Sequence, residues 1–288
     1  MRAGFLPKLL FAPSVILVLV TVYGYIMFTV YLSFTASTMM PEFDLQGGAA
    51  YHRLLNLENW KVSLDNLTTF AILYILIAMA LGLALAILID QKIRLESGFR
   101  SIFLYPMALS FIVTGTAWKW LLDPGVGLER SMHLMGWESF SFTWIKDSEM
   151  AIYCVVIAAV WQTSGFVMAM FLAGLRGVDT EQINAAKVDG AKTWQIYLRI
   201  ILPQLGHVFV SSFVILAHMA IKSYDLIIAL TNGGPGRSTW LPSVFMYQYT
   251  FTRNEMAVGA ASSVLMLAAT AVVVLPYLFN EMRKAKNG

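Results

Sequence analysis

Residues 179–203 read DTEQINAAKVDGAKTWQIYLRIILP and form a polar, helix-forming segment between two long apolar runs. Asp179 or Thr180 can cap a first short helix, with Gln182 placed three residues after Asp179 as in a capping box. Gly190 offers a left-handed backbone position of the kind on which helices commonly end. The segment therefore predicts a short helix that ends at a glycine.

A second short helix is expected over residues 191–200, and Pro203 marks where it gives way to the next element. Ala185 and Ala186 leave little side-chain bulk, so the first helix can lie close in a groove of another protein. The polar contacts around it are expected from Glu181, Lys187 and Asp189. The apolar set expected to pack back on the rest of the chain is Val188, Ala191, Trp194 and Tyr197. The residues equally allow an amphipathic helix that rests on lipid headgroups.

The composition around this segment is that of a membrane protein. Apolar residues make up 58% of the 288 positions and charged residues only 13%, against roughly a quarter charged in soluble domains. A spanning helix needs about 20 apolar residues. Six runs meet that need: residues 9–34, 66–89, 101–122, 150–175, 205–230 and 257–279. Pro106 and Gly115 are expected kink points in the third run. The predicted fold is an all-α membrane protein with six transmembrane helices.

The positively charged residues predict the orientation. Twelve of the 20 Lys and Arg residues, among them Arg2 and Lys92, fall on one side of the six runs and six on the other. Because the side with the excess faces the cytoplasm, both termini are expected there. Three tryptophans in the two long outside loops are expected to anchor at the membrane interface or to contact an outside partner. They are Trp60, Trp137 and Trp144.

No residue pattern predicts a metal site or a nucleic-acid surface. The single cysteine, Cys154, lies in an apolar run and is expected to be a buried hydrophobe. His207 and His218 are eleven residues apart on one run, too far for a local metal pair, and are expected to pack. The basic residues are scattered over loops, so no nucleic-acid partner is expected.

The polar segment resembles the EAA loop of ABC importer permeases, the membrane subunits of binding-protein-dependent transporters. Gly190 matches the hallmark glycine of that loop, and Asp189, Ala191 and Pro203 match as well. Asn184 stands where the family usually has Glu, which removes one charge from the expected docking surface. The resemblance covers the whole chain, most strongly from residue 66 onward.

The resemblance implies the type I ABC importer permease fold and several partners. It implies a first helix and a periplasmic loop at residues 1–65, then a transmembrane domain at residues 66–281 with a cytoplasmic coupling loop at residues 176–204. The implied partners are the bilayer, a second permease, a cytoplasmic ATPase dimer and a periplasmic or lipoprotein solute-binding protein. No phosphate-binding G-x-x-x-x-G-K-[ST] motif occurs in the chain, so no cofactor is expected on it, and ATP and Mg²⁺ are expected on the ATPase. The expected location is the bacterial inner membrane.

The fifth apolar run contains the ionisable residues that most invite a functional interpretation. Lys222 and Asp225 are three residues apart, so on one helix they can pair, either as a structural contact or as part of a translocation path with Tyr224 and Asn232. The turn Gly233-Gly234-Pro235 that follows is similar to the G-G-P segment of the sugar-type, maltose-permease-like subgroup.

Sugar transport would use aromatic faces and amide groups, and candidate path residues are Trp118, Trp161 and Gln162, although aromatics at span ends also serve as interface anchors. The runs at residues 103–111 and 118–124 are similar to those of permeases for glucose, mannose or α-glucosides. The alternatives are a permease of this fold for a non-sugar solute, or a secondary carrier. In every case we expect no catalytic residue on the chain itself.

Overall fold

A computed structural model describes residues 5–91 and 94–287. The described residues form helices, turns and one isolated β-bridge between Thr35 and Leu45. They divide into two compact units, one made of residues 1–61 and 245–268 and the other of residues 62–244 and 269–288. Two long helices, α4 (Glu58–Asp90) and α15 (Met256–Asn287), contribute residues to both units.

The first unit contains the first apolar run and the outside loop that follows it. Its elements are α1 (Phe5–Val18), a π-helical turn at Leu19–Tyr23, α2 (Gly24–Leu32), α3 (Ala49–Asn56) and a π-helical turn at Gln248–Thr252. Trp60 is only 3% exposed in this unit, and its ring meets that of Phe245 edge to face at 5.2 Å. The expectation that Trp60 anchors at the membrane interface is therefore wrong, because the side chain is buried among protein side chains.

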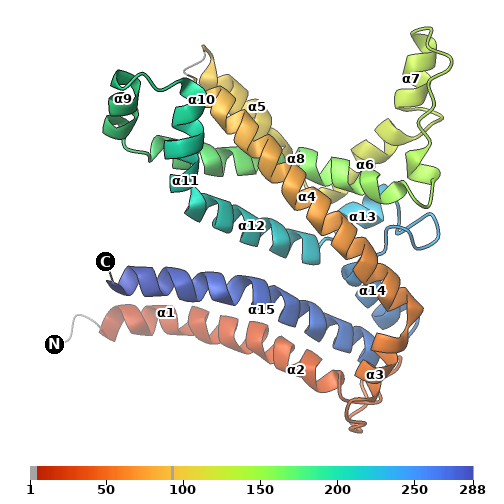
Figure 1. Ribbon diagram of the computed structural model, residues 1–288. Coiled ribbons are helices and arrows are strands. Elements are labelled where there is room, and N and C mark those ends of the chain that lie inside the picture. The colour runs from red at the N-terminus through yellow and green to blue at the C-terminus, as the bar shows by residue number, and fades with distance from the viewer. Residues whose placement is uncertain (1–4, 92–93, 288) are drawn as a thin grey trace. The chain divides into compact units, whose positions relative to one another are not determined.

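The second unit holds the remaining helices (Figure 1). Before the coupling loop these are α5 (Glu96–Ala108), α6 (Phe111–Leu122), α7 (Leu128–Leu134), a short 3₁₀ turn at Trp144–Lys146 and α8 (Ala151–Arg176). Within and after the coupling loop, the helices of this unit are α9 (Thr180–Val188), α10 (Thr193–Ile196), a π-helical turn at Tyr197–Ile201, α11 (Leu202–Gln204), α12 (Gly206–Ile221) and α13 (Asp225–Leu230). The helix α14 (Pro242–Tyr247) contributes three residues to each unit.

Four helices are long and apolar enough to cross a membrane, and two bent helix pairs could each supply one more span. The four lie at Phe11–Leu32, Glu58–Asp90, Ala151–Arg176 and Met256–Arg283. The bent pairs are α5 with α6, at 99°, and the helical stretch Thr193–Gln204 with α12, at 65°. All six apolar runs of the sequence are therefore helical. The count of six spans and the cytoplasmic placement of the termini stay predictions, and Arg2 and Lys92, used for the orientation, lie outside the described residues.

Two boundaries differ from those expected. The second span begins at Glu58, eight residues before the expected start, because its first two turns are polar and a hydropathy pattern leaves them out. The third run bends between Ala108 and Phe111, two residues after Pro106. Gly115 is not a kink point. An added Cβ there would lie 2.6 Å from the Ala229 Cβ, so the glycine permits close packing of α6 on α13.

The helix α8 is the most buried of the four long apolar helices, with 72% of its most apolar stretch buried. It packs closely on α5, because Gly165 brings the two backbones together: a Cβ at this position would lie 1.7 Å from the carbonyl oxygen of Phe103. Cys154 is fully buried on α8, as expected for a small hydrophobe.

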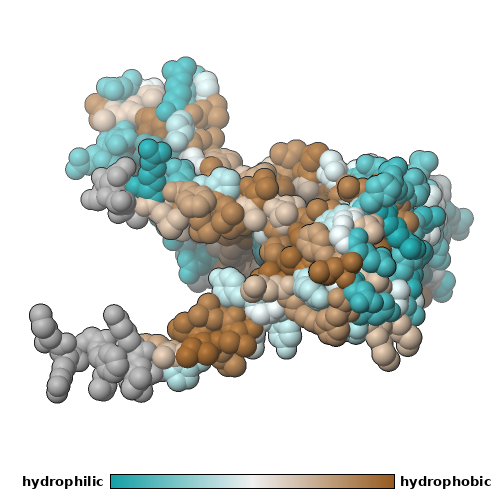
Figure 2. Space-filling model, turned by 90° about the horizontal axis from the view of Figure 1, so that it is seen from below, coloured by the Kyte–Doolittle hydropathy of each residue, from teal (hydrophilic) through white to brown (hydrophobic). Residues whose placement is uncertain are grey.

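The outer surface of the apolar helices is itself apolar. Large side chains such as Phe11, Leu17 and Leu76 are more than 60% exposed, and apolar residues cover broad areas of the space-filling view (Figure 2). Such surfaces are what a bilayer solvates and water does not. They agree with a multi-pass membrane protein.

Candidate functional site

The coupling loop, residues 176–204, begins with a capped helix. The Asp179 carboxylate accepts a hydrogen bond from the backbone N–H of Glu181 at 2.8 Å and so caps α9. The expected capping box with Gln182 does not form. The side-chain oxygen of Gln182 instead accepts a hydrogen bond from Gln204 at 2.9 Å, which ties the first turn of α9 to the end of α11.

Gly190 ends α9 as the sequence predicts. Its φ is +78°, in the left-handed region that favours glycine. The N–H of Gly190 donates to the carbonyl of Lys187 at 3.1 Å, and the N–H of Ala191 donates to that of Ala186 at 2.9 Å. These two bonds form a Schellman motif, which satisfies carbonyls that would otherwise lack partners at the helix end.

The exposed face of α9 differs from the expected one, because Ala186 was expected to face a partner's groove together with Ala185 and instead faces inward. Ile183 and Ala186 are half-buried against the apolar core of the second unit. The opposite, exposed face consists of Glu181, Asn184, Ala185 and Val188. The spacing of these four residues, i, i+3, i+4 and i+7, places them on one stripe of the helix.

Two of the four apolar residues that were expected to pack on the rest of the chain are exposed instead. Val188 is 87% exposed and Trp194 is 56% exposed, so their packing prediction is wrong. Ala191 and Tyr197 do pack against the core. Val188 points outward because the inward positions of α9 are already occupied by Ile183 and Ala186.

The second half of the coupling loop is helical for longer than expected. It runs through α10, the π-helical turn and α11 to Gln204, so Pro203 lies inside it. The chain bends by 65° at Leu205, just after Pro203, and continues as α12. The buried Leu205 side chain fixes this corner in the core. α9 and α10 lie together at one end of the second unit (Figure 1).

The fifth apolar run is broken at its ionisable residues, which the sequence did not predict. α12 ends at Ile221, with Lys222 as its C-cap, and α13 begins at Asp225. Lys222 and Asp225 therefore do not share one helical face, and within the described residues no ion pair joins them. The expected i, i+3 pair is wrong, because Ser223 and Tyr224 leave the helix.

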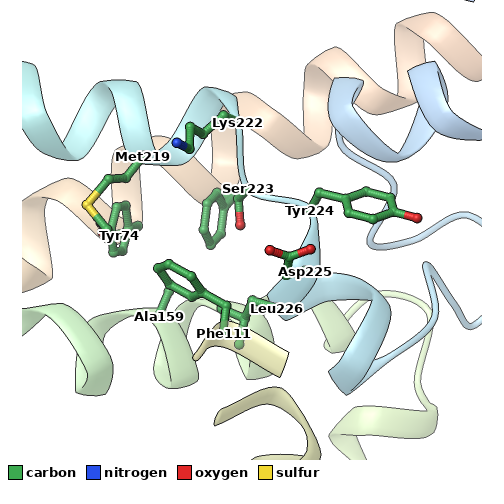
Figure 3. A pocket seen from close by; sticks show the side chains of 10 residues that line it. Tyr74, Phe111, Ala159, Met219, Lys222, Ser223, Tyr224, Asp225 and Leu226 are labelled. Carbon is green, nitrogen blue, oxygen red and sulfur yellow. Dashed lines mark hydrogen bonds between the residues drawn. The ribbon is translucent and has the colours of Figure 1, made fainter. Parts of the chain in front are cut away.

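A cavity of about 150 Å³ opens at this break (Figure 3). It is lined by the polar residues of the break, by aromatic rings and by neighbouring apolar side chains. Lys222 stands at the end of α12 and Asp225 at the start of α13, with Ser223 and Tyr224 between them. The aromatic rings come from other helices: Phe70 and Tyr74 of α4, stacked on each other at 5.3 Å, and Phe111 at the start of α6.

The sequence missed these three aromatic residues. Phe70 and Tyr74 are one helical turn apart in an apolar run, where rings usually serve as core packing. No residue pattern shows that the break in the fifth run faces them, because the juxtaposition depends on long-range packing.

The other expected path residues lie near one another but outside the cavity lining. Trp118 and Trp161 meet edge to face at 5.8 Å. Gln162 is only 1% exposed, and its side-chain N–H donates to the carbonyl of Leu109 at 2.9 Å. Leu109 lies at the bend between α5 and α6. Gln162 therefore satisfies a carbonyl that the bend leaves without a helical partner, which is a structural role.

The Gly233-Gly234-Pro235 turn is a well-connected loop. Asn232 and Gly233 have φ values of +54° and +83° and carry the chain out of α13. The hydroxyl of Thr239 lies 2.7 Å from that of Thr231 and also donates to the carbonyl of Gly234.

A helix of the same unit holds the far side of this turn. The side-chain amide of Asn66 on α4 donates to the carbonyls of Arg237 and Trp240 at 3.1 and 3.0 Å. Asn232 itself is exposed and does not line the cavity.

No cluster that could hold a metal ion occurs among residues 5–91 and 94–287. The described sites are a helix with one exposed stripe, and a cavity lined by aromatic rings, one amine and one carboxylate.

Comparison with known proteins identifies a family. The family described as "binding-protein-dependent transport system inner membrane component" matches residues 78–283. A probable ABC transporter permease protein of Pyrococcus horikoshii is 41% identical over 269 residues, covering 93% of this chain and 92% of that protein. The xylose/arabinose import permease protein XacH of Haloferax volcanii is 31% identical, covering 93% and 86%.

Solved structures show the same fold. A chain of a bacterial ABC transporter involved in the import of the acidic polysaccharide alginate superposes with a TM-score of 0.82. The two chains are 19% identical, and the match covers 98% of this chain and 96% of the other. With the family match over residues 78–283 and the 41% identical relative, these findings show that the chain belongs to the binding-protein-dependent transport system inner membrane component family, the permease subunits of ABC importers.

Proposed function

We propose that this permease moves a sugar across the cell membrane by alternating access, and that glucose, mannose or an α-glucoside is the transported class. The observation that carries the proposal is the cavity at the break in the fifth apolar run. Aromatic rings that can stack on a sugar ring lie there beside Lys222, Ser223 and Asp225, which can bond to hydroxyl groups. The names of relatives add support, since XacH is a xylose/arabinose import permease and MalF of Thermococcus litoralis belongs to a trehalose/maltose transport system.

The cavity holds one sugar unit at most. Its volume of about 150 Å³ is below the roughly 300–1,000 Å³ of typical ligand sites. We therefore place the rest of the substrate path on a second permease subunit, which would face this one across the path. A solute-binding protein outside would deliver the sugar, as the alginate transporter crystallised with its periplasmic protein suggests.

The energy would come from a separate ATPase dimer, since the chain carries no phosphate-binding loop. In this proposal ATP and Mg²⁺ bind only to that partner. The exposed stripe of α9, formed by Glu181, Asn184, Ala185 and Val188, would dock into a groove of the ATPase. The small alanine side chain allows close approach, and Val188 supplies apolar contact. Docking at α9 requires the coupling loop to lie in the cytoplasm, and with four spans before the loop and two after it both termini would lie there too.

Transport in proteoliposomes tests the proposal. The complete complex, with the second permease, the ATPase and the solute-binding protein, is reconstituted and given radiolabelled glucose, mannose, maltose, glycerol 3-phosphate or histidine. We expect ATP-dependent uptake of a neutral sugar. ATP-dependent uptake of histidine or glycerol 3-phosphate, with no sugar uptake, would contradict the proposed substrate class.

A matched pair of variants tests the cavity. Phe111→Ala removes a ring that lines the cavity, whereas Phe213→Ala removes an exposed ring of α12 outside the lining. We expect the first to lower sugar uptake about tenfold, the effect of losing about 1.4 kcal/mol of interaction, and the second to leave it unchanged. Equal uptake by the two variants would show that the cavity is not part of the substrate path.

Lys222 supports a second candidate, a phosphorylated small solute. A free amine at the cavity can pair with a phosphate group. The sn-glycerol-3-phosphate permease UgpA of Pectobacterium atrosepticum is 30% identical over 76% of this chain. Asp225 lines the same cavity and would repel an anion, which is why we favour a neutral sugar. Lys222→Gln separates the two, since it would abolish uptake of a phosphorylated solute and leave most of that of a neutral sugar.

A further inference from the structure

A polar cluster ties both ends of the coupling loop to the same carboxylate. Arg176, the last residue of α8, places its Nη2 2.6 Å from Glu96 Oε1 and its Nε 3.9 Å from Asp90 Oδ1. Asp90 is the last residue of α4, and Glu96 is the first residue of α5. Arg176 lies three residues before Asp179, the cap of α9. The N-terminal end of the loop is thus held to α4 and α5.

The other end of the loop reaches Asp90 through Tyr197. The Tyr197 hydroxyl lies 3.5 Å from Asp90 Oδ2, and it accepts a hydrogen bond from the side chain of Gln91 at 2.8 Å. Tyr197 follows α10 and is half-buried against the core. Because α9 lies between Arg176 and Tyr197, the cluster brackets the helix that carries the exposed stripe.

We infer that Arg176 is a positioning residue that makes α9 and the cytoplasmic ends of α4 and α5 move together. The inference rests on the proposed role of α9 as the segment that the ATPase moves. If α9 shifts, Arg176 and Tyr197 shift with it, and Asp90 and Glu96 must follow or lose their partners. A guanidinium can contact two carboxylates from one position, and a lysine ammonium cannot match that geometry.

The cluster is poorly suited to stabilising the fold alone. The Arg176 side chain is 43% exposed, and those of Asp90 and Glu96 are 28% and 30% exposed. Ion pairs as exposed as these contribute little to folding stability. Their geometry is nevertheless specific, since three chain segments meet at one guanidinium. The expected effect of breaking the cluster is therefore on coupling more than on stability.

Arg176→Gln tests the inference, with Arg53→Gln as a matched control. Arg53 forms an ion pair of similar length with Glu255, 2.8 Å, in the first unit and far along the chain from the loop. Both variants are made in the complete transporter in proteoliposomes. For Arg176→Gln we expect at least about fivefold more ATP hydrolysed per sugar imported, the low end of typical allosteric couplings, with an unchanged thermal midpoint. We expect Arg53→Gln to behave as the natural chain, and Arg176→Lys to lie between.

A second readout does not depend on which solute is carried. Backbone hydrogen exchange is measured with and without ATP in the complex. We expect ATP to change exchange in α9 and at the end of α4 in the natural chain, and in α9 alone in Arg176→Gln. An ATP response at the end of α4 that survives in Arg176→Gln would overturn the inference and leave the proposed function standing. A natural complex in which ATP changes neither segment would overturn the docking role of α9 and the inference with it.

Discussion

Replacing Gly190 by alanine tests how the coupling loop keeps its shape. The φ of Gly190 is +78°, and an L-residue held in this left-handed region costs about 1–2 kcal/mol. An added Cβ would meet nothing within 4 Å, so no steric clash adds to the cost. The lower entropy of an unfolded chain with alanine offsets about 0.4–1 kcal/mol of it. At the middle of both ranges the net cost is about 0.8 kcal/mol, or roughly a fourfold loss of the native end of α9.

Hydrogen exchange of the α9 amides in the complete transporter measures this loss, together with sugar uptake in proteoliposomes. Gly190→Ala should speed exchange in α9 by roughly that factor and lower uptake. Gly190→Asn should stay close to the natural chain, because asparagine tolerates left-handed backbone. Gly47→Ala is the matched control: Gly47 has a φ of +60° and open space around it, but it lies in the loop between α2 and α3.

Two results would refute this reasoning. If Gly190→Ala exchanges and transports like the natural chain, the Schellman end of α9 does not govern the loop. If Gly190→Asn is as impaired as Gly190→Ala, the cause is the presence of a side chain and not the backbone conformation. Impaired uptake in Gly47→Ala as well would show a general effect of the substitution.

Three further changes have expected magnitudes. Gly165→Ala places a Cβ 1.7 Å from the carbonyl of Phe103, so α5 and α8 must separate; we expect a loss of more than about 2 kcal/mol, seen as a lower thermal midpoint in detergent. Gln162→Leu leaves the carbonyl of Leu109 without its donor and should lower the free energy of unfolding by about 1–2 kcal/mol, measured in the same thermal unfolding experiment. An unchanged thermal midpoint would show that the Gln162 amide does not stabilise the bend. Asp179→Ala removes the cap of α9 and should cost about 0.5–2 kcal/mol of helix stability, measured by faster exchange of the first α9 amides.

The features that local chemistry decides could be predicted from the sequence. Six apolar runs predicted helices, and all six are helical. A capped start of α9 at Asp179 or Thr180 was also predicted, and Asp179 supplies the cap; the left-handed end at Gly190 was predicted as well, since both features depend on the residues at those positions. The turn at Gly233-Gly234-Pro235 likewise follows from its own residues.

The break in the fifth apolar run could not be predicted in this way. Residues 205–230 read as one helix because the apolar pattern continues through Lys222 and Asp225. Contacts from elsewhere hold the break: the Ser243 hydroxyl donates to the carbonyl of Ser223, and α13 packs closely on α6 at Gly115. The exposure of Val188 was missed for a similar reason, since the pattern shows an apolar residue but not which positions of α9 the core already fills.

The central claim, that α9 couples this subunit to ATP hydrolysis, is tested most directly by sugar accumulation in proteoliposomes. The complete transporter, with either natural α9 or Ala185→Arg on its exposed stripe, is given ATP and a radiolabelled neutral sugar. We expect the natural chain to accumulate sugar above the outside concentration, and Ala185→Arg to abolish accumulation because the bulky side chain blocks docking. Accumulation by the variant equal to that of the natural chain would contradict the claim that this subunit receives the work of ATP at α9.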